Sequence, residues 1–435
     1  MMLLIKGGRV IDPAGKRDET GSVWIENGKV KDFVAGEQVP KGYEGRVIDA
    51  GGKWVVPGLV DMHVHLRDPG YEWKEDIRTG TLAAAAGGFS SIACMANTKP
   101  VNDHPEVTKY ILEKAAREGA AAVYPVAAVT RGIEGKEMVD FAELAEAGAV
   151  AFSDDGKPVA SSLLMRRSLE YAKAFGLLLL SHAEDPELCG GGAAHEGWTA
   201  HRLGIPGIPS AAEEVAIARD ILLAKQTGGR LHIQHISTKM GVDLLRMAKR
   251  AGLSVTGETA PHYFTLTDAC LEGYNTNAKM NPPLRGEEDR MAVLEGLLDG
   301  TIDAIATDHA PHDDYVKRCE FIAAANGIIG LETALPLSLG LIAGGKVTPS
   351  RVVELLSANP ARILKLSGKG SLGKGADADV TIIDPDAEWE YREDGVRSKS
   401  RNSPFFGWKL RGRAVATLRG GRVTHSLMDG VAADA

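Results

Sequence analysis

The sequence predicts an α/β protein: a TIM-like (β/α)8 barrel with a small β-sandwich domain built from both chain termini. Three observations lead to this prediction. The middle of the chain alternates apolar strands with helical stretches, both ends are rich in short strands and glycine turns, and histidine or aspartate follows several central strands. Strands that alternate with helices are typical of βα units around a parallel sheet.

The two ends of the chain have the same character. In the N-terminal segment 1–57, Ser22–Ile25 leads into Asn27-Gly28, a sequence typical of a hairpin turn. In the C-terminal segment 365–435, apolar strands flank Gly420-Gly421. Neither segment is large enough to bury a core alone, so we expect one sandwich to form from both.

The central segment 58–364 is long enough for a barrel, which takes roughly 250 residues. Helical patterns such as Glu213–Lys225 and Lys239–Ala251 separate its strands. Such barrels carry their chemistry at the C-terminal ends of the strands. The eight strand candidates are Leu59–Val64, Phe89–Ala93, Ala122–Ala127, Ala149–Phe152, Leu177–Ser181, Leu231–His235, Leu253–Thr256 and Ile302–Ala306.

Composition argues against several classes of partner. A chain of 435 residues with 44% hydrophobic and 25% charged residues is typical of a globular protein. A net charge of -8 without a basic stripe argues against nucleic acid. The longest apolar run, Ala174–Leu180, is far too short to span a membrane. The four cysteines lack C-x-x-C spacing, so we expect reduced thiols in a cytoplasmic protein.

Polar residues at the predicted strand ends form a candidate metal site. His63 and His65 are two residues apart on the first strand, so they project from the same face. Imidazoles and carboxylates that converge at one rim would hold two divalent ions with a shared hydroxide. One such residue alone is usually structural, so the hypothesis depends on the whole set: His63, His65, Asp154 or Asp155, His182, His235 and Asp308.

The alternation of side chains narrows this set. His232 and His235 are three residues apart, so on a strand only one of them faces the barrel mouth. His235 lies nearer the strand end and is the expected ligand. Asp154 and Asp155 also face opposite ways, and alternation does not choose between them.

Several motifs resemble the class I dihydroorotases of the amidohydrolase superfamily, and the resemblance covers nearly the whole chain. The motifs are His63-Val64-His65-Leu66-Arg67-Asp68-Pro69-Gly70, Met95-Ala96-Asn97-Thr98-Lys99-Pro100, Ser153-Asp154-Asp155-Gly156, Gln234-His235-Ile236-Ser237-Thr238, Lys279-Met280-Asn281-Pro282-Pro283-Leu284-Arg285 and Ala306-Thr307-Asp308-His309-Ala310-Pro311-His312.

The resemblance implies a zinc-dependent, reversible cyclisation of N-carbamoyl-L-aspartate to L-dihydroorotate and water, a step of pyrimidine biosynthesis. This class places an aspartate where many amidohydrolases carry a carboxylated lysine, and the family's spacing to the strand-five histidine selects Asp155 over Asp154. A bridging hydroxide would be the nucleophile and Asp308 the general acid/base. Two Zn²⁺ per subunit would be held by His63, His65, Asp155, His182, His235 and Asp308.

The resemblance also implies how the substrate is held. Arg67 can bind its carboxylate through two parallel hydrogen bonds, which lysine cannot do. The implied substrate contacts are His65, Arg67, Asn97, Asn281, His312, Asn326 and Gly327. The polar segment 312–325 follows the eighth strand, so it is either a mobile lid or an ordinary surface loop.

Two alternative functions stay open at this point. A hydantoinase or allantoinase hydrolyses a related cyclic amide, but these enzymes resemble the chain less, since they lack an arginine at the position of Arg67 and usually keep the bridging lysine. An inactive scaffold partner of aspartate transcarbamoylase would typically have lost metal ligands, and here the set is complete. The resemblance leaves a homodimer and a complex with aspartate transcarbamoylase as partners to consider.

Overall fold

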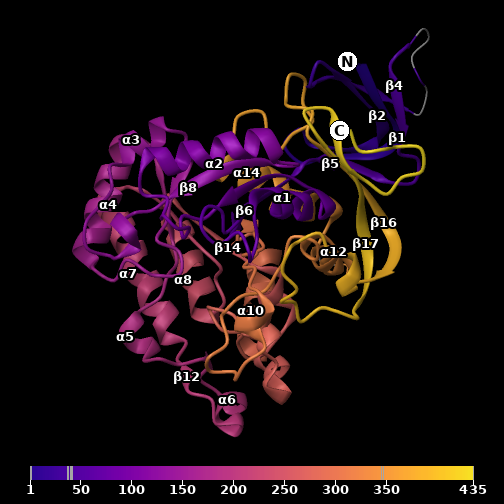
Figure 1. Ribbon diagram of the computed structural model, residues 1–435. Helices are drawn as coiled ribbons and strands as arrows, with labels where there is room; N and C mark the ends of the chain where they lie inside the picture. The colour runs from indigo at the N-terminus through magenta and orange to yellow at the C-terminus, as the bar shows by residue number, and fades with distance from the viewer. Residues whose placement is uncertain (1, 37–38, 40–42, 344, 346, 435) are drawn as a thin grey trace.

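The computed structural model describes residues 2–36, 39, 43–343, 345 and 347–434. A barrel with surrounding helices occupies the middle of the chain, and strands from the two termini lie together on one side of it (Figure 1). The indigo N-terminal strands and the yellow C-terminal strands belong to one sheet. The predicted fold class is therefore confirmed.

Eight parallel strands form the barrel wall. The first strand is joined to the segment after the last one, because Val64 forms a parallel bridge with His309 and the His65 N–H donates to the His309 carbonyl at 2.9 Å. In spatial order the strands are β6 (Leu59–Val64), β7 (Phe89–Cys94), β8 (Ala122–Ala127), β9 (Ala151–Phe152), β10 (Leu178–Ser181), β13 (Arg230–Ile233), β14 (Val255–Thr259) and β15 (Ala304–Ile305).

A helix follows each barrel strand and covers its outer face. In the fifth and sixth of these helices the expected helical patterns are extended or shortened by one or two residues. The helices are α1 (Ile77–Ala86), α2 (Pro105–Glu118), α3 (Phe141–Glu146), α4 (Ser162–Ala174), α7 (Ala211–Thr227), α8 (Lys239–Arg250), α10 (Glu287–Leu298) and α12 (Ala334–Ala343).

Helix α8 shows why these segments are helical. Thr238 caps it by accepting a hydrogen bond from the Gly241 N–H, and Val242, Leu245 and Ala248 are buried at helical spacing. Among the residues that the structure describes, no helix is both long and apolar enough to cross a membrane.

Shorter elements occupy the loops. They are α5 (Pro186–Cys189), β11 (Ala194–His195), α6 (Trp198–Leu203), β12 (Gly207–Ile208), α9 (Pro261–Thr265), α11 (Asp314–Lys317), α13 (Pro349–Val353) and α14 (Asn359–Ile363).

The barrel interior has an apolar core of its own below the polar mouth. Val60 and Met62 of β6 belong to this core, and Ala361 and Ile363 of α14 pack against it. Residues of opposite parity, such as Leu59, belong instead to the layer between strands and helices. A filled interior leaves the C-terminal strand ends as the place where polar side chains gather.

The terminal strands join in a single hydrogen-bonded sheet. Strand β5 ends at Pro57 and pairs antiparallel with β16, which joins the two ends of the chain. The strands share a core that includes Leu3, Ile25 and Val380. The order is β18 (Arg422–Ser426), β17 (Lys409–Arg419), β16 (Val380–Glu390), β5 (Trp54–Pro57), β1 (Met2–Asp12), β2 (Arg17–Glu26) and β3 (Lys29–Ala35), with β4 (Arg46–Asp49) paired to β1.

Candidate metal centre and active site

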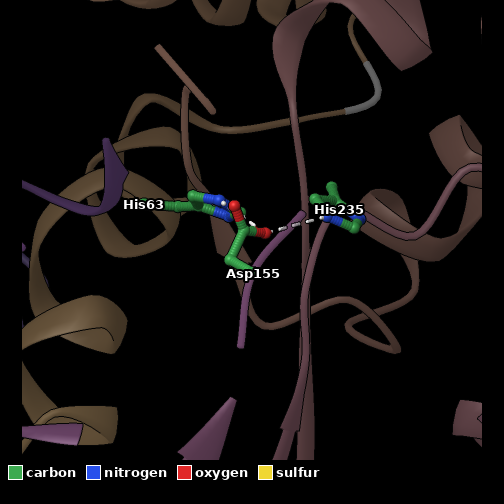
Figure 2. A group of neighbouring side chains, drawn as sticks. All are labelled: His63, Asp155 and His235. Carbon is green, nitrogen blue, oxygen red and sulfur yellow. Dashed lines mark ion pairs between the residues drawn. The ribbon is translucent and has the colours of Figure 1, made fainter. Parts of the chain in front are cut away.

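Asp155 lies among buried imidazoles at the mouth of the barrel, between His63 and His235 (Figure 2). Its Oδ1 is 3.4 Å from Nε2 of His63 and 3.6 Å from Nε2 of His235, and its Oδ2 is 3.3 Å from Nε2 of His65. Nδ1 of His182 is 3.2 Å from Asp155 Oδ1 and 2.8 Å from His235 Nε2. One carboxylate thus contacts histidines that follow or end three different strands.

Asp308 faces two of these histidines from the end of the last strand. Its Oδ1 is 3.2 Å from Nε2 of His65 and 3.5 Å from Nε2 of His63. Two groups have ligand atoms that all lie within 4.8 Å of one another: His63, Asp155 and His235, and His63, His65 and Asp308. The six predicted ligands therefore meet in one place.

His63 shows that this cluster fits a cation. Its Nδ1 is 2.8 Å from the Glu258 carboxylate, which can only accept, so the ring nitrogen that faces Asp155 and Asp308 is the one left to bind a ligand. This buried Nε2 forms no hydrogen bond within the part of the chain that the structure describes. A buried nitrogen lone pair that faces two carboxylates needs a proton or a metal ion between them. Imidazole and carboxylate donors suit zinc and similar divalent metals.

A β-bulge in β6 places both histidines of the pair on the inner face. Val60 and Met62 already face the barrel interior. The register against β7 then shifts by one residue before Val64, which packs in the outer core. His63 and His65 are consequently the next two side chains to point inward, as expected for a bulge that re-aims side chains near an active site.

Three residues of the site have a left-handed backbone just beyond a barrel strand. Arg67 has φ 61°, His235 has φ 34° and Asp308 has φ 47°. Non-glycine residues rarely adopt this conformation, and such strain is concentrated at functional sites. The surrounding hydrogen bonds must therefore hold these side chains in place.

The alternation argument for the sixth strand is wrong in one respect. The argument assumed that the strand continues to His235, but β13 ends at Ile233. His235 lies in a turn with a left-handed backbone, and this turn brings its side chain inward. His232, which lies on the strand itself, also faces the interior. Nε2 of His232 is 3.3 Å from Glu258. Side-chain alternation holds only while the backbone stays extended.

The two neighbouring aspartates do different things. The Asp154 carboxylate accepts hydrogen bonds from the backbone N–H groups of Val129 and Thr130 and from the Thr130 hydroxyl, and burial raises the pKa of Asp154 to about 6. Asp154 therefore ties down the loop after β8. Asp155 alone of the two faces the histidines, which agrees with the choice that the family resemblance implied.

The buried carboxylates and imidazoles of this centre stabilise each other's charged forms. Burial opposes ionisation of Asp155, but His63, His182 and His235 hold its pKa well below the usual value. Burial likewise opposes the charged form of His182, yet Asp155 and Glu184 raise its pKa to about 10. Metal binding must displace these protons, so it competes with protonation of the histidines.

Glu258 is a residue that the sequence argument missed. Its carboxylate is buried at the end of β14 and contacts both His63 and His232, as given above. Burial acts against its ionisation, but the two histidines lower its pKa to about 2. The predicted seventh strand stopped at Thr256, whereas β14 continues to Thr259. A glutamate inside this buried strand is the signal that could have identified it.

The residues predicted to bind the substrate carboxylate lie beside the six predicted metal ligands, which we call the metal cluster. The Arg67 Nε donates to the Pro311 carbonyl at 3.2 Å, and its Nη2 is 3.3 Å from Nε2 of His312. Nδ1 of His312 is 3.4 Å from the Lys74 ammonium, a second cation that sequence reasoning did not include. Among the described residues, neither Arg67 nor Lys74 forms an ion pair with a carboxylate.

Charge at this place favours an anion. Burial lowers the pKa of Arg67 to about 10, which leaves the guanidinium charged at neutral pH. Burial, together with Arg67 and Lys74, lowers the pKa of His312 to about 2, so its imidazole is neutral. We call Arg67, Lys74 and His312 the cationic pocket.

The three predicted asparagine contacts differ in their surroundings. Asn97 places Oδ1 2.9 Å from Nδ1 of His65, and Asn281 donates to Glu184 at 2.8 Å while its own Oδ1 forms no hydrogen bond to a described residue. Asn326 is exposed. The neighbouring Gly327 N–H already donates to the Lys279 carbonyl at 2.9 Å. Contact of the Asn326-Gly327 backbone with a ring stays a prediction.

The predicted lid segment is anchored at its centre. It contains α11, and the buried Lys317 donates from Nζ to the carbonyls of Ala325 and Gly327 at 2.9 and 3.1 Å. Tyr315, in contrast, is 89% exposed. Whether the segment moves during turnover stays a prediction.

Comparison with known proteins now places the chain. A model of the Dihydro-orotase-like family matches residues 52–241. A dihydroorotase of Geobacter metallireducens is 55% identical over 98% of this chain and 100% of its own length, and one of Geotalea daltonii is 55% identical over 98% and 99%. The chain belongs to the dihydroorotase family. The predicted family and enzyme class are confirmed.

The solved structures that match this chain include a hydantoinase with a similar fold. The L-hydantoinase (dihydropyrimidinase) from Arthrobacter aurescens matches with a TM-score of 0.89 over 99% of this chain and 97% of that one, at 27% identity. The fold is thus shared with hydantoinases. The relatives at 55% identity are dihydroorotases, so the hydantoinase alternative is not favoured.

Proposed function

We propose that this protein is a zinc-dependent dihydroorotase that interconverts N-carbamoyl-L-aspartate and L-dihydroorotate. One observation carries the substrate assignment: the cationic pocket lies beside the metal cluster and lacks an acidic partner among the described residues. L-dihydroorotate offers a carboxylate and a cyclic amide on one ring. The pocket suits the first group and the metal cluster suits the second.

The six clustered residues would hold two divalent ions. His63, His65, Asp155, His182, His235 and Asp308 would hold these ions, with Asp155 as the ligand that the two ions share. When bound, such ions supply Lewis acidity and hydroxide at neutral pH. Glu258 would keep the proton of His63 on Nδ1, which leaves Nε2 free to bind.

Asp308 would move the proton. Burial acts against its charge, but His63 and His65 lower its pKa, so the carboxylate is ionised at neutral pH and able to accept. In ring opening, Asp308 takes the proton of the attacking water and gives it to the ring nitrogen as the amide bond breaks. In cyclisation, it takes the proton from the attacking nitrogen and gives it to the leaving water.

The cationic pocket would orient the substrate. Arg67, with His312 beside it, can present two parallel N–H groups to the carboxylate, and Asn97, which contacts His65, would bind the same group. Asn281 would contact the amide edge through its unpaired Oδ1. Fixing the carboxylate places the scissile carbonyl over the metal cluster, and such positioning is a large part of catalysis.

The first experiment compares two substrates. Purified protein should contain about two zinc ions per chain and should hydrolyse L-dihydroorotate much faster than dihydrouracil, the same ring without the carboxylate. A chelator should abolish the activity and zinc should restore it. Equal or better hydrolysis of dihydrouracil would instead favour the dihydropyrimidinase-type alternative, and a metal-bound but inactive protein would favour the scaffold alternative.

The second experiment removes the guanidinium. Arg67→Ala should reduce kcat/KM for L-dihydroorotate by about 100-fold or more, since a bidentate charged contact is lost, and should leave the zinc content unchanged. Arg78→Ala, an exposed arginine on α1, is the matched control and should behave as wild type. Unchanged kinetics in Arg67→Ala would refute the carboxylate assignment.

A homodimer and a complex with aspartate transcarbamoylase remain proposals that rest on the family resemblance, and a cytoplasmic location remains one that rests on the cysteine pattern. Analytical ultracentrifugation of the chain alone and with aspartate transcarbamoylase tests the first two.

A further inference from the structure

The C-terminal part of the chain crosses the active-site face between β16 and β17. Residues 397–402, which we call the strap, lie far from the barrel in sequence but make hydrogen bonds at its mouth. The loop after β6, which contains Lys74, lies on one side of the strap. The loop after β15, which contains His312, lies on the other.

The strap is fixed to the loop after β6 by several bonds. The Ser400 hydroxyl donates to the Lys74 carbonyl at 2.6 Å, and the Lys399 N–H donates to the buried Glu75 carboxylate at 3.1 Å. Glu75 also accepts from the Ser398 hydroxyl. The backbone that carries Lys74 is thereby attached to the C-terminal segment.

A single side chain attaches the strap to the other loop. The buried Asn402 donates through Nδ2 to the carbonyls of Ala310 and Gly327, at 2.9 Å each. Its Oδ1 accepts from the His312 N–H at 3.0 Å. Both amide hydrogens and the amide oxygen of Asn402 are therefore used on the loop that carries His312.

We propose that Asn402 is a positioning residue for substrate binding: the strap joins the two walls of the cationic pocket and sets the distance from His312 to Arg67 and Lys74. The proposal rests on the assignment of this pocket to the substrate carboxylate. Asn402 does not touch the substrate. It acts on the His312 backbone, and an asparagine is suited to this because one amide supplies two donors and an acceptor in a plane.

The geometry predicts which kinetic constant changes. Among the residues that the structure describes, Asn402 forms no hydrogen bond to a predicted metal ligand, and its side-chain hydrogen bonds reach residues 310, 312 and 327. Loss of the side chain should loosen carboxylate binding and leave the metal cluster intact. A displacement of the pocket by about an ångström can cost up to 100-fold.

The test uses Asn402→Ala with Asn359→Ala as the control. Asn359 is also a buried asparagine, and its Nδ2 donates to the Asp303 carbonyl at 2.8 Å, next to the start of β15. We expect Asn402→Ala to raise KM for L-dihydroorotate about tenfold or more, with kcat within about threefold of wild type and zinc content unchanged. Asn359→Ala should leave KM unchanged.

A second variant keeps the shape of the side chain. Asn402→Asp can still accept from the His312 N–H but cannot donate to Ala310 and Gly327, so it should also raise KM. This variant serves as the test if Asn402→Ala does not fold. If KM is unchanged in Asn402→Asp, the proposal for Asn402 is wrong. It is also wrong if KM is unchanged in Asn402→Ala while Arg67→Ala is impaired. In that case the assignment of Arg67 to the substrate carboxylate still holds. Parallel losses of zinc and kcat in the variants of Asn402 and Asn359 also overturn it.

Discussion

The metal cluster and the cationic pocket lie side by side but are built in different ways. The cluster takes its residues from the ends of barrel strands or the turns just beyond them, and each strand is held by parallel neighbours. The pocket takes Lys74 and His312 from loops, which hydrogen bonds to the strap join together. Side chains that bind metal need fixed geometry to a fraction of an ångström, and strand ends provide it.

This difference separates chemistry from substrate choice. Loops can change without disturbing a barrel, so the proposed carboxylate contacts can vary while the proposed metal ligands stay the same. Variants on the two sides should therefore have different kinetic signatures.

The largest effect is expected from the bridging aspartate. Asp155→Asn should lose at least one metal ion per chain and reduce kcat/KM by about 1000-fold or more, since an amide lacks the charge to bridge two cations. Metal analysis and turnover of L-dihydroorotate measure both. Asp154→Asn is the matched control, because its amide oxygen can still accept from Val129 and Thr130, and it should keep its metals. If the Asp155 variant retains both ions, the bridging role is wrong.

A smaller effect is expected from Glu258, which should change the affinity for metal but not the binding of substrate. Glu258→Gln removes the carboxylate charge that faces both His63 and His232, so the apparent zinc affinity should fall by about 10–100-fold. Competition with a coloured chelator measures that affinity on the unloaded protein. KM at saturating zinc should stay at the wild-type value. A raised KM with normal zinc affinity would contradict the separation of the two sides.

The smallest effect concerns the strap and pH. Glu332 accepts from the N–H groups of Arg397 and Ser398, and burial raises its pKa from 4.5 to about 7. Because the pKa is raised in the folded state, the stabilisation from this group is complete below pH 4.5 and is lost as the pH rises through about 7.

Unfolding in urea at pH 5.5 and at pH 8 measures this contribution. Wild type should lose about 2 kcal/mol more than Glu332→Gln between these two pH values, since glutamine does not titrate. An equal pH dependence in the two proteins would show that Glu332 does not titrate in this range.

Sequence patterns predicted the strands well where they are long and apolar. β6 and β8 match their predicted bounds. The sixth and seventh strands are displaced at their C-terminal ends, where Glu258 interrupts the apolar pattern and His235 has a left-handed backbone. These polar ends belong to the site, where local propensity gives way to tertiary contacts.

The sequence by itself determined the barrel, the joining of both termini in one sheet and the choice of the histidines and aspartates that meet at the barrel mouth. These depend on local periodicity and on residue type, which the chain carries directly. The tertiary structure alone decided that Asp154 caps a loop, that Glu258 supports His63 and that Asn402 joins the walls of the cationic pocket. These roles depend on contacts between segments as far as 326 residues apart along the chain, and no local pattern specifies a contact across such a distance.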